Sequence, residues 1–261
     1  MYLVFCVAFV LIAISLLIFL IKNRKEGQNL FNKYQQLTES TLAKAFNLSP
    51  HPVKREFRKI NPMKMLKLIT ILVDSRTGGR LARVNTLDAT IGGFMKMYTL
   101  LVRPDFAYNL PVLSVDLIFA GKKRVFIIEV IDPAGAEDEN KNQYYQKFRE
   151  CAKGIEHLEA SGTESEWSKD FLTDFSIHVK ADRQSDELLF NIYERYLGLY
   201  LEMVQKSSSL DEPSAERIQK GMETYVATLL EKGGPAVNVF KNLLGPQGQT
   251  EFVRTVIFGL D

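Results

Sequence analysis

The stretch Val112-Leu113-Ser114-Val115-Asp116-Leu117-Ile118-Phe119 has the alternation of a strand inside a folded sheet. Its odd-numbered residues from Leu113 to Phe119 share an apolar face, and Ser114 and Asp116 share the opposite face. An ionised carboxylate there must find hydrogen-bond donors or keep its proton. Asp116 is therefore a candidate proton donor to a ligand. The alternative is that it pairs with an arginine or accepts hydrogen bonds from backbone N–H groups.

Four further strand-like runs surround this stretch. The five runs cover residues 65–73, 80–88, 94–103, 112–119 and 124–131. Residues 75–79 and 121–123 have the pattern of hairpin turns, because they contain glycine, which adopts positive φ readily, and the flanking residues alternate. Consecutive strands joined by tight turns predict an antiparallel meander.

Helical patterns lie mostly after these strands. They cover residues 137–159, 185–205, 214–231 and 247–258, with a further amphipathic helix at 28–48 and a possible strand at 174–179. Strands first and helices second predict an α+β fold with helices on one or both faces of an antiparallel sheet. The same order argues against a doubly wound nucleotide fold.

The first 21 residues are uncharged and almost wholly apolar, which is enough helix, at about 1.5 Å per residue, to cross a bilayer core of about 30 Å. Lys22, Arg24 and Lys25 follow directly, a pattern that favours an uncleaved anchor over a signal peptide. We expect a single-pass membrane protein whose soluble domain is cytoplasmic. The predicted domains are an anchor at 1–21, a juxtamembrane basic amphipathic helix and linker at 22–62, and a folded domain at 63–261.

Charge is divided unevenly along the chain. Residues 22–103 contain 16 Lys and Arg but only 5 Asp and Glu, whereas residues 104–261 contain 17 and 26. The basic part predicts attraction to anionic membrane lipid or to an acidic protein partner. Nucleic acid is not expected as a partner, because the sequence has no nucleic-acid-binding motif.

The sequence lacks the common cofactor and hydrolase motifs. It has no phosphate-binding glycine loop, no G-x-S-x-G, no H-E-x-x-H and no C-x-x-C, so neither a bound cofactor nor a metal site is expected. Its three histidines, His51, His157 and His178, fall in different elements and are expected to be structural or to lie on the surface.

Three acidic residues lie on the predicted strands: Asp88, Asp116 and Glu129. Carboxyl groups that share one face of a sheet raise at least one pKa through burial and like charge. Such a group keeps its proton near neutral pH. The alternative is that Asp88 belongs to a turn and that Glu129 pairs with Lys96 or Arg124.

Two stretches carry a resemblance to a known family. Residues 103–116, Arg-Pro-Asp-Phe-Ala-Tyr-Asn-Leu-Pro-Val-Leu-Ser-Val-Asp, resemble the central signature of the ferredoxin-dependent bilin reductases, a proline followed by Tyr-x-Leu-Pro-x-x-x-x-Asp. Residues 240–245 and 251–258 are similar to the closing helices of that family. The resemblance extends over about residues 65–261. It implies a three-layer α/β/α sandwich with a central antiparallel sheet.

The resemblance also implies an activity. Members of the family contain neither metal nor flavin, take single electrons from ferredoxin and reduce biliverdin with protons from side chains. Asp116 would be the central proton donor, and Asp88 would be the acid on an earlier strand. The family position that often carries His or Asn falls on Thr99, and a polar position before the penultimate helix falls on Gly233-Gly234.

Further residues are candidates for binding the substrate. Thr99, Ser114 and Glu129 are candidates on the sheet, and the propionate groups of a bilin would need cationic partners. The candidates for that role are Arg80, Arg83, Lys96 and Arg103, although each of them can instead pair with a local acid.

Two other functions are compatible with this sequence. One is a non-catalytic tetrapyrrole-binding or membrane scaffold protein with the same fold, in line with the departures at Thr99 and Gly233-Gly234. The other is an adaptor that uses only its basic surface, including Lys54, Arg55, Arg58 and Lys59.

Overall fold

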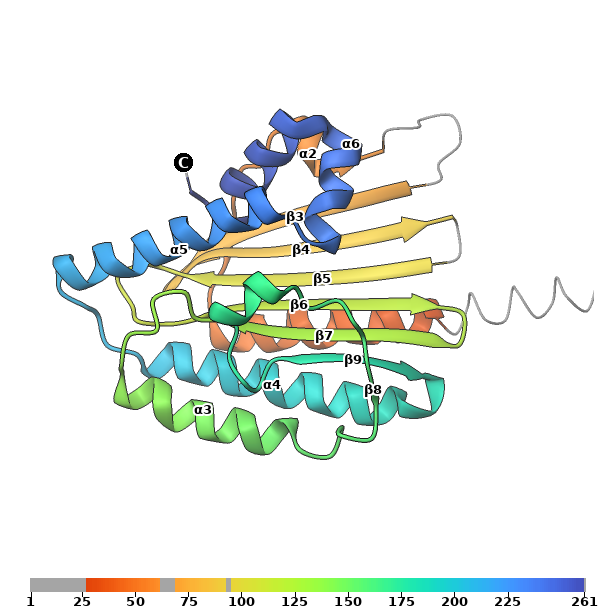
Figure 1. Ribbon diagram of the computed structural model, residues 1–261, viewed down its shortest axis with the longest axis horizontal. Helices are drawn as coiled ribbons and strands as arrows, with labels where there is room; N and C mark the ends of the chain where they lie inside the picture. The colour runs from red at the N-terminus through yellow and green to blue at the C-terminus, as the bar shows by residue number, and fades with distance from the viewer. Residues whose placement is uncertain (1–26, 62–68, 93–94, 261) are drawn as a thin grey trace, which may run out of the picture.

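An antiparallel sheet forms the centre of the computed structural model, which describes residues 27–61, 69–92 and 95–260 (Figure 1). Within these ranges the sheet has nine strands, in the order β1-β3-β4-β5-β6-β7-β9-β8, with β2 paired to β3. The strands are β1 Ser49–Pro50, β2 Lys59–Ile60, β3 Ile69–Gly78, β4 Leu81–Ile91, β5 Met95–Pro104, β6 Val112–Ala120, β7 Lys123–Ile131, β8 Glu159–Ala160 and β9 Ile177–Asp182.

The five long strands β3 to β7 form the predicted meander. Each pairs with the next in antiparallel register, and Thr99 of β5 lies opposite Asp116 of β6. Gly79 and Gly121 adopt φ of 59° and 61° in the turns after β3 and β6, a conformation that glycine reaches without steric cost. The antiparallel sheet with flanking helices is thus confirmed.

Helices cover both faces of this sheet (Figure 1). They are a helix over residues 27–45, α2 Arg55–Arg58, α3 Glu139–Ala152, α4 Asp186–Lys206, α5 Glu212–Lys232, α6 Pro235–Glu251 and a π-helix, Phe252–Phe258, with short 3₁₀ turns at Glu166–Asp170 and Arg183–Ser185. The helix predicted at 247–258 is thus the end of α6 followed by the π-helix. α6 bends at Gly245, whose φ of 75° is not helical.

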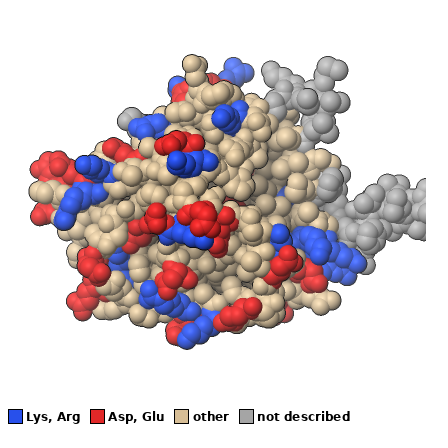
Figure 2. Space-filling view, viewed as in Figure 1, with Lys and Arg blue, Asp and Glu red and all other residues tan. Residues whose placement is uncertain are grey.

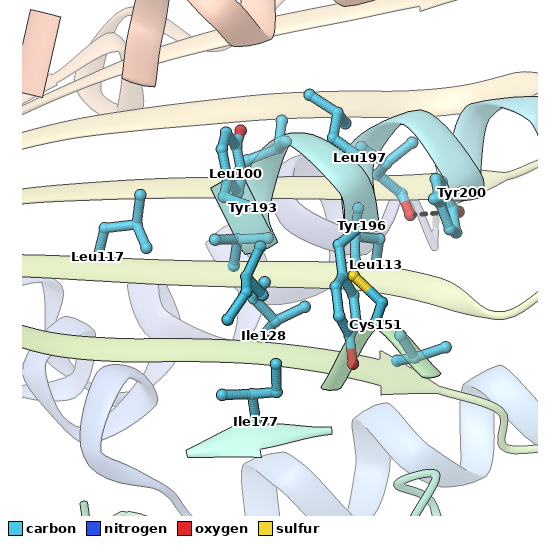
Figure 3. Packing of buried hydrophobic residues seen from close by; sticks show 14 of the residues in the cluster. Leu100, Leu113, Leu117, Ile128, Cys151, Ile177, Tyr193, Tyr196, Leu197 and Tyr200 are labelled. Atoms are coloured by element: carbon cyan, nitrogen blue, oxygen red, sulfur yellow. Dashed lines mark hydrogen bonds between the residues drawn. The ribbon is translucent and has the colours of Figure 1, made fainter. Parts of the chain in front are cut away.

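One face of the sheet, here called the packed face, is closed by the helix over residues 27–45, α3 and α4. Leu113 and Leu117 of β6 are at most 1% exposed there and belong to the same buried cluster as the tyrosines of α4 (Figure 3). The Tyr196 hydroxyl donates to the carbonyl of Phe175 at 2.7 Å. The Tyr200 hydroxyl donates to Pro111 O at 2.9 Å. These two hydroxyl groups of α4 are thus hydrogen-bonded to the main chain, which avoids the cost of desolvating them alone.

The other face, here called the cavity face, is covered by α5, α6, the π-helix and residues 163–172 (Figure 1). The Asn85 side-chain amide of β4 donates to the carbonyls of Val256 and Ile257 at 3.0 and 2.8 Å. It thereby holds the π-helix against the sheet. The Trp167 indole donates to Gly233 O at 3.1 Å and ties the 3₁₀ turn to the end of α5.

The helix over residues 27–45 is part of the packed face. Phe31 and Tyr34 are at most 2% exposed, and the Tyr34 ring lies 5.2 Å from that of Tyr193 in α4. Residues before and after position 62 therefore contribute to the same core. The predicted domain boundaries at residues 22–62 and 63–261 stay a prediction.

The predicted membrane anchor, residues 1–21, lies outside the described residues. In the part of the chain that the structure describes, no helix is both long and apolar enough to cross a bilayer. The longest of these helices, α4 and α5, have 21 residues each and carry charged side chains at both ends and in the middle. We therefore correct the predicted localisation as a single-pass membrane protein with a cytoplasmic soluble domain, which this finding contradicts.

Candidate functional site

A cavity of about 350 Å³ lies on the cavity face, between the sheet and its covering helices. The sheet forms its floor, and side chains of α5, α6 and the π-helix form its walls. Most of the lining is apolar, including Ile71, Leu87, Met97, Ile118 and Val253. A hollow of this character suits a largely hydrophobic organic ligand.

Five polar side chains converge on the cavity floor because of strand register. Thr99, Asp116 and His178 belong to one row across the sheet, in which Thr99 pairs with Asp116, Asp116 with Ile127, and Ile127 with His178. Ser114 and Glu129 pair in the neighbouring row. All five line the cavity. The shared face predicted for Ser114 and Asp116 is therefore present in the structure.

Asp116 lies within the cavity and has no ion-pair partner among the described residues. Its Oδ1 accepts a hydrogen bond from the Thr99 hydroxyl. Burial raises the pKa of Asp116, and the hydrogen bond from Thr99 opposes this rise. An acid in this setting favours its protonated form more than an exposed aspartate does, which is the state required of a proton donor.

Glu129 is the second acid on the cavity floor. Burial raises the pKa of Glu129 to about 8, and the negative charges of Asp116 and Glu164 add to the rise. The alternative partners are engaged elsewhere: Arg124 binds Asp186 at 2.6 and 2.9 Å, and Lys96 donates to Thr90 Oγ1 at 2.7 Å.

His178 lies next to Glu129, with its Nε2 3.4 Å from Glu129 Oε1. Its Nδ1 is 3.2 Å from the Thr163 hydroxyl, and burial lowers its pKa. The sequence places His178 among the structural or surface histidines. Its alternation with the apolar residues Ile177 and Val179 indicates that His178 lies on the opposite face of a strand from them. The pairing of β9 with β7, which brings His178 to Glu129, is a long-range contact that local alternation does not reveal.

Asp88 is not brought to this cavity. It pairs with Tyr98 across β4 and β5, and both side chains are directed to the packed face, where the Gln35 amide donates to Asp88 Oδ2 at 3.5 Å. Burial raises the pKa of Asp88, while the nearby Lys96 and the hydrogen bond from Gln35 lower it. Its catalytic role is a prediction from the family resemblance, and its position on the packed face argues against that role.

The four predicted partners of propionate groups lie outside the cavity lining. Arg80 donates to Gln205 O at the end of α4, and Lys96 lies 5.5 Å from the centre of the Phe31 ring on the packed face. Arg83 and Arg103 lie beside Gly259, and Arg103 donates to its carbonyl at 3.4 Å. Their role in binding a substrate stays a prediction.

One of the two glycines that fall on a polar family position lies at the cavity. Gly234 lines it at the start of α6, and the carbonyl of Gly233 accepts the Trp167 indole N–H. This part of the wall therefore offers main-chain atoms in place of a polar side chain.

Taken together, the cavity combines apolar walls with a floor that contains two acids whose pKa is raised, a histidine and the hydroxyl groups of Thr99 and Ser114. This arrangement can hold a large conjugated ligand and donate protons to it. Among the described residues there is no group of three or more His, Cys, Asp or Glu side chains able to hold a metal ion.

Charge on the cavity face is mixed. Figure 2 shows Lys and Arg side chains interspersed with Asp and Glu on this side of the molecule. The basic excess of residues 22–103 therefore does not appear as one continuous basic surface in this view.

Comparison with known proteins gives consistent results. A family model described as ferredoxin-dependent bilin reductase matches residues 35–259. The chain is 22% identical to 15,16-dihydrobiliverdin:ferredoxin oxidoreductase of Nostoc punctiforme over 188 residues, which are 69% of this chain and 73% of that protein. It is 19% identical to phycoerythrobilin:ferredoxin oxidoreductase of Parasynechococcus marenigrum over 233 residues, 85% of this chain and 88% of that protein.

A solved structure shares the fold. The crystal structure of phytochromobilin synthase from tomato in complex with biliverdin superposes with a TM-score of 0.74 at 16% identity, covering 87% of this chain and 82% of that chain.

Proposed function

This chain belongs to the ferredoxin-dependent bilin reductase family, and we propose that it reduces a linear tetrapyrrole of the biliverdin type with electrons from ferredoxin. The observation that carries this proposal is Asp116, an acid whose burial raises its pKa and which faces an apolar cavity. The names of the relatives support the substrate class, because both refer to bilins and to ferredoxin.

The lining of the cavity suits the chemistry of such a substrate. A linear tetrapyrrole is a long conjugated molecule whose rings favour apolar surroundings and whose pyrrole N–H and lactam groups need polar partners. Asp116, Thr99 and Ser114 offer such partners on the floor, and aliphatic side chains surround them. A protonated Asp116 would donate its proton to the pigment once an electron has arrived.

The electrons would come from a separate protein. Members of this family are ferredoxin-dependent by name, and no bound cofactor is part of the proposal. Reduced ferredoxin is a one-electron donor, so the two-electron reduction of one double bond requires two electron transfers. Anionic lipid, the third partner expected from the sequence, stays a prediction from the basic residues 22–103.

The experiment compares the full chain with its Asp116→Asn variant. Each protein is mixed with biliverdin, ferredoxin and a system that keeps ferredoxin reduced, and pigment absorbance is followed. We expect the variant to bind the pigment within a few-fold of the wild-type affinity and to reduce it about 10²–10⁴ times more slowly, as is typical of a lost acid catalyst. Asp170→Asn, at an exposed position of the 3₁₀ turn, is the matched control. A fully active Asp116→Asn variant would contradict the proposal.

A second function is favoured by one observation. Thr99 and Gly234 line the cavity where acid–base or polar groups would otherwise contribute. A non-catalytic tetrapyrrole-binding protein would show a shifted pigment band in the same assay, with no reduction by the wild-type chain.

A further inference from the structure

Glu129 and His178 form a pair on the cavity floor, beside Asp116. Glu129 Oε1 lies 3.4 Å from His178 Nε2, longer than a well-formed hydrogen bond, and this Nε2 is buried without a hydrogen-bond partner. Both side chains line the cavity. Buried polar atoms are rarely left without partners, so an unpartnered one at a cavity requires an explanation.

Hydrogen-bonding groups connect this pair to a surface segment. His178 Nδ1 is 3.2 Å from the Thr163 hydroxyl, which is 2.6 Å from the Ser161 hydroxyl. The Ser161 N–H also donates to the backbone carbonyl of His178 at 2.9 Å. The adjacent Glu164 is exposed. A path of polar groups thus runs from the cavity floor through His178 to the segment 161–165.

The position of Glu129 relative to Asp116 follows from the pairing of β6 with β7. Glu129 lies opposite Ser114, and Asp116 is two residues further along the same face of β6. Diagonal neighbours of this kind are about 7–8 Å apart in antiparallel sheets. A ligand that lies along the floor can therefore contact both carboxyl groups at once.

We propose that Glu129 is a second proton donor of this site and that His178 is a positioning residue, which orients the Glu129 carboxyl group and returns a proton to it from the segment 161–165. This inference rests on the proposed function. Thr99 and Gly233-Gly234 stand where the family resemblance expects polar or acid–base side chains, and none of them is an acid. Glu129 would supply the second proton that these residues cannot.

The reaction balances with two donors. Reduction of one C=C bond breaks its π bond and forms two C–H bonds, which takes up two electrons and two protons. Two reduced ferredoxins supply one electron each, Asp116 supplies one proton and Glu129 supplies the other. Both carboxylates then regain protons from water, Glu129 by way of His178.

The titratable groups that face Glu129 are Asp116 from β6, His178 from β9, Glu164 from the segment 161–165 and Tyr225 from α5. In the described part of the chain no lysine or arginine lines the cavity. Burial and the two acidic neighbours raise the pKa of Glu129 to about 8, and burial lowers that of His178. Near pH 7 the pair therefore has a neutral carboxyl group beside a neutral imidazole, a state from which Glu129 can donate.

The first test is the Glu129→Gln variant of the full chain, with biliverdin and reduced ferredoxin. We expect pigment binding within about threefold of wild type, an unchanged first electron transfer, and completion of the reduction slowed at least about 100-fold. The half-reduced pigment should accumulate as a radical that electron paramagnetic resonance detects. Glu129→Asp should restore part of the rate, and the exposed Glu216→Gln is the matched control.

The pH profile separates proton donation from a structural role. In the wild type, the rate of the second step should fall as pH rises through about 8, where Glu129 loses its proton. This fall in rate near pH 8 should be absent in Glu129→Gln. His178→Gln should shift the pH at which the rate falls. It should also slow multiple turnovers more than a single turnover, because it interrupts the return of a proton to Glu129.

Two outcomes overturn the proposal. One is a Glu129→Gln variant that completes the reduction at the wild-type rate while Asp116→Asn does not, which leaves the proposed function standing. The other is an ordinary pKa for the Glu129 carboxyl in the pigment-free chain, measured by ¹³C NMR. A wild-type chain that binds but never reduces the pigment overturns the proposed function instead, and the NMR titration then still decides whether Glu129 holds a proton at neutral pH.

Discussion

The tyrosines of the packed face and the acids of the cavity face are buried in different surroundings. On the packed face, the hydroxyls of Tyr196 and Tyr200 donate to main-chain carbonyls. On the cavity face, Asp116 and Glu129 line a cavity to which no lysine or arginine of the described residues contributes. Satisfied groups contribute stability, whereas carboxyl groups kept from water and from cations have a raised pKa.

One strand supplies both faces. Alternate residues of β6 enter the packed core at Leu113, Val115 and Leu117 and the cavity at Ser114 and Asp116. A single residue step along β6 therefore separates a position important for stability from a position that we associate with function. The side chains of the site and those of the packed core therefore share a backbone but not a face of the sheet.

The largest expected effect comes from shortening neighbouring side chains on opposite faces. Leu117 is 1% exposed in the packed core, and Leu117→Ala should cost about 2–5 kcal/mol of unfolding free energy, because the transfer of the side chain is lost and a void is left. Ile118 lines an existing cavity, so Ile118→Ala should cost only about 1–2 kcal/mol.

Urea unfolding of the two variants measures this difference, with equal slopes required for a direct comparison. Ile118→Ala should also alter pigment affinity more than Leu117→Ala does. Equal losses of stability at the two positions would show that the faces are packed alike.

An effect of intermediate size is expected from pH, which should change the stability of the folded chain through the titration of Glu129. The pKa of Glu129 is raised to about 8 in the folded chain, above its ordinary value of 4.5. Between these values the folded state holds a proton that the unfolded chain has released, so stability falls as pH rises through this window. Each unit of a raised pKa corresponds to about 1.4 kcal/mol.

Glu129→Gln removes this titration. Relative to wild type, the variant should gain at least about 1 kcal/mol of stability between pH 5 and pH 9, measured as unfolding midpoints across that range. A constant difference between the two proteins at all pH values would mean that Glu129 titrates normally. Glu216→Gln, at an exposed site of α5, controls for the general effect of removing a charge.

The smallest expected effect is that of Asp88→Asn. Asp88 is on the packed face beside Gln35, not in the cavity, so we expect reduction of biliverdin within about twofold of wild type and a stability change below about 1 kcal/mol. The measurement is the assay used for Asp116→Asn. A loss as large as that of Asp116→Asn would show that an acid on the packed face takes part in the chemistry.

Much of the fold follows from local patterns in the sequence. Alternation and turn glycines define the strands β3 to β7, and helical periodicity defines α3, α4 and α5. The helix before the π-helix was harder to predict, because Gly233-Gly234 and Gly245-Pro246 are typical of chain breaks. In the structure the first pair precedes α6, and the second forms the bend within it.

The candidate site was only partly predictable. Alternation is enough to place Ser114 beside Asp116, since both lie on one strand. The face of Asp88 depends instead on the register between β4 and β5. His178 reaches Glu129 through the pairing of strands whose members lie some fifty residues apart, and no local pattern encodes that contact.

The order in which the covering helices occur along the chain has a consequence for biosynthesis. All helices of the packed face lie within residues 27–206, whereas α5, α6 and the π-helix follow from residue 212 onward. Chains emerge from the ribosome amino-terminal end first. A nascent chain can therefore bury the packed face before α5, α6 and the π-helix exist, and the cavity is completed late in synthesis.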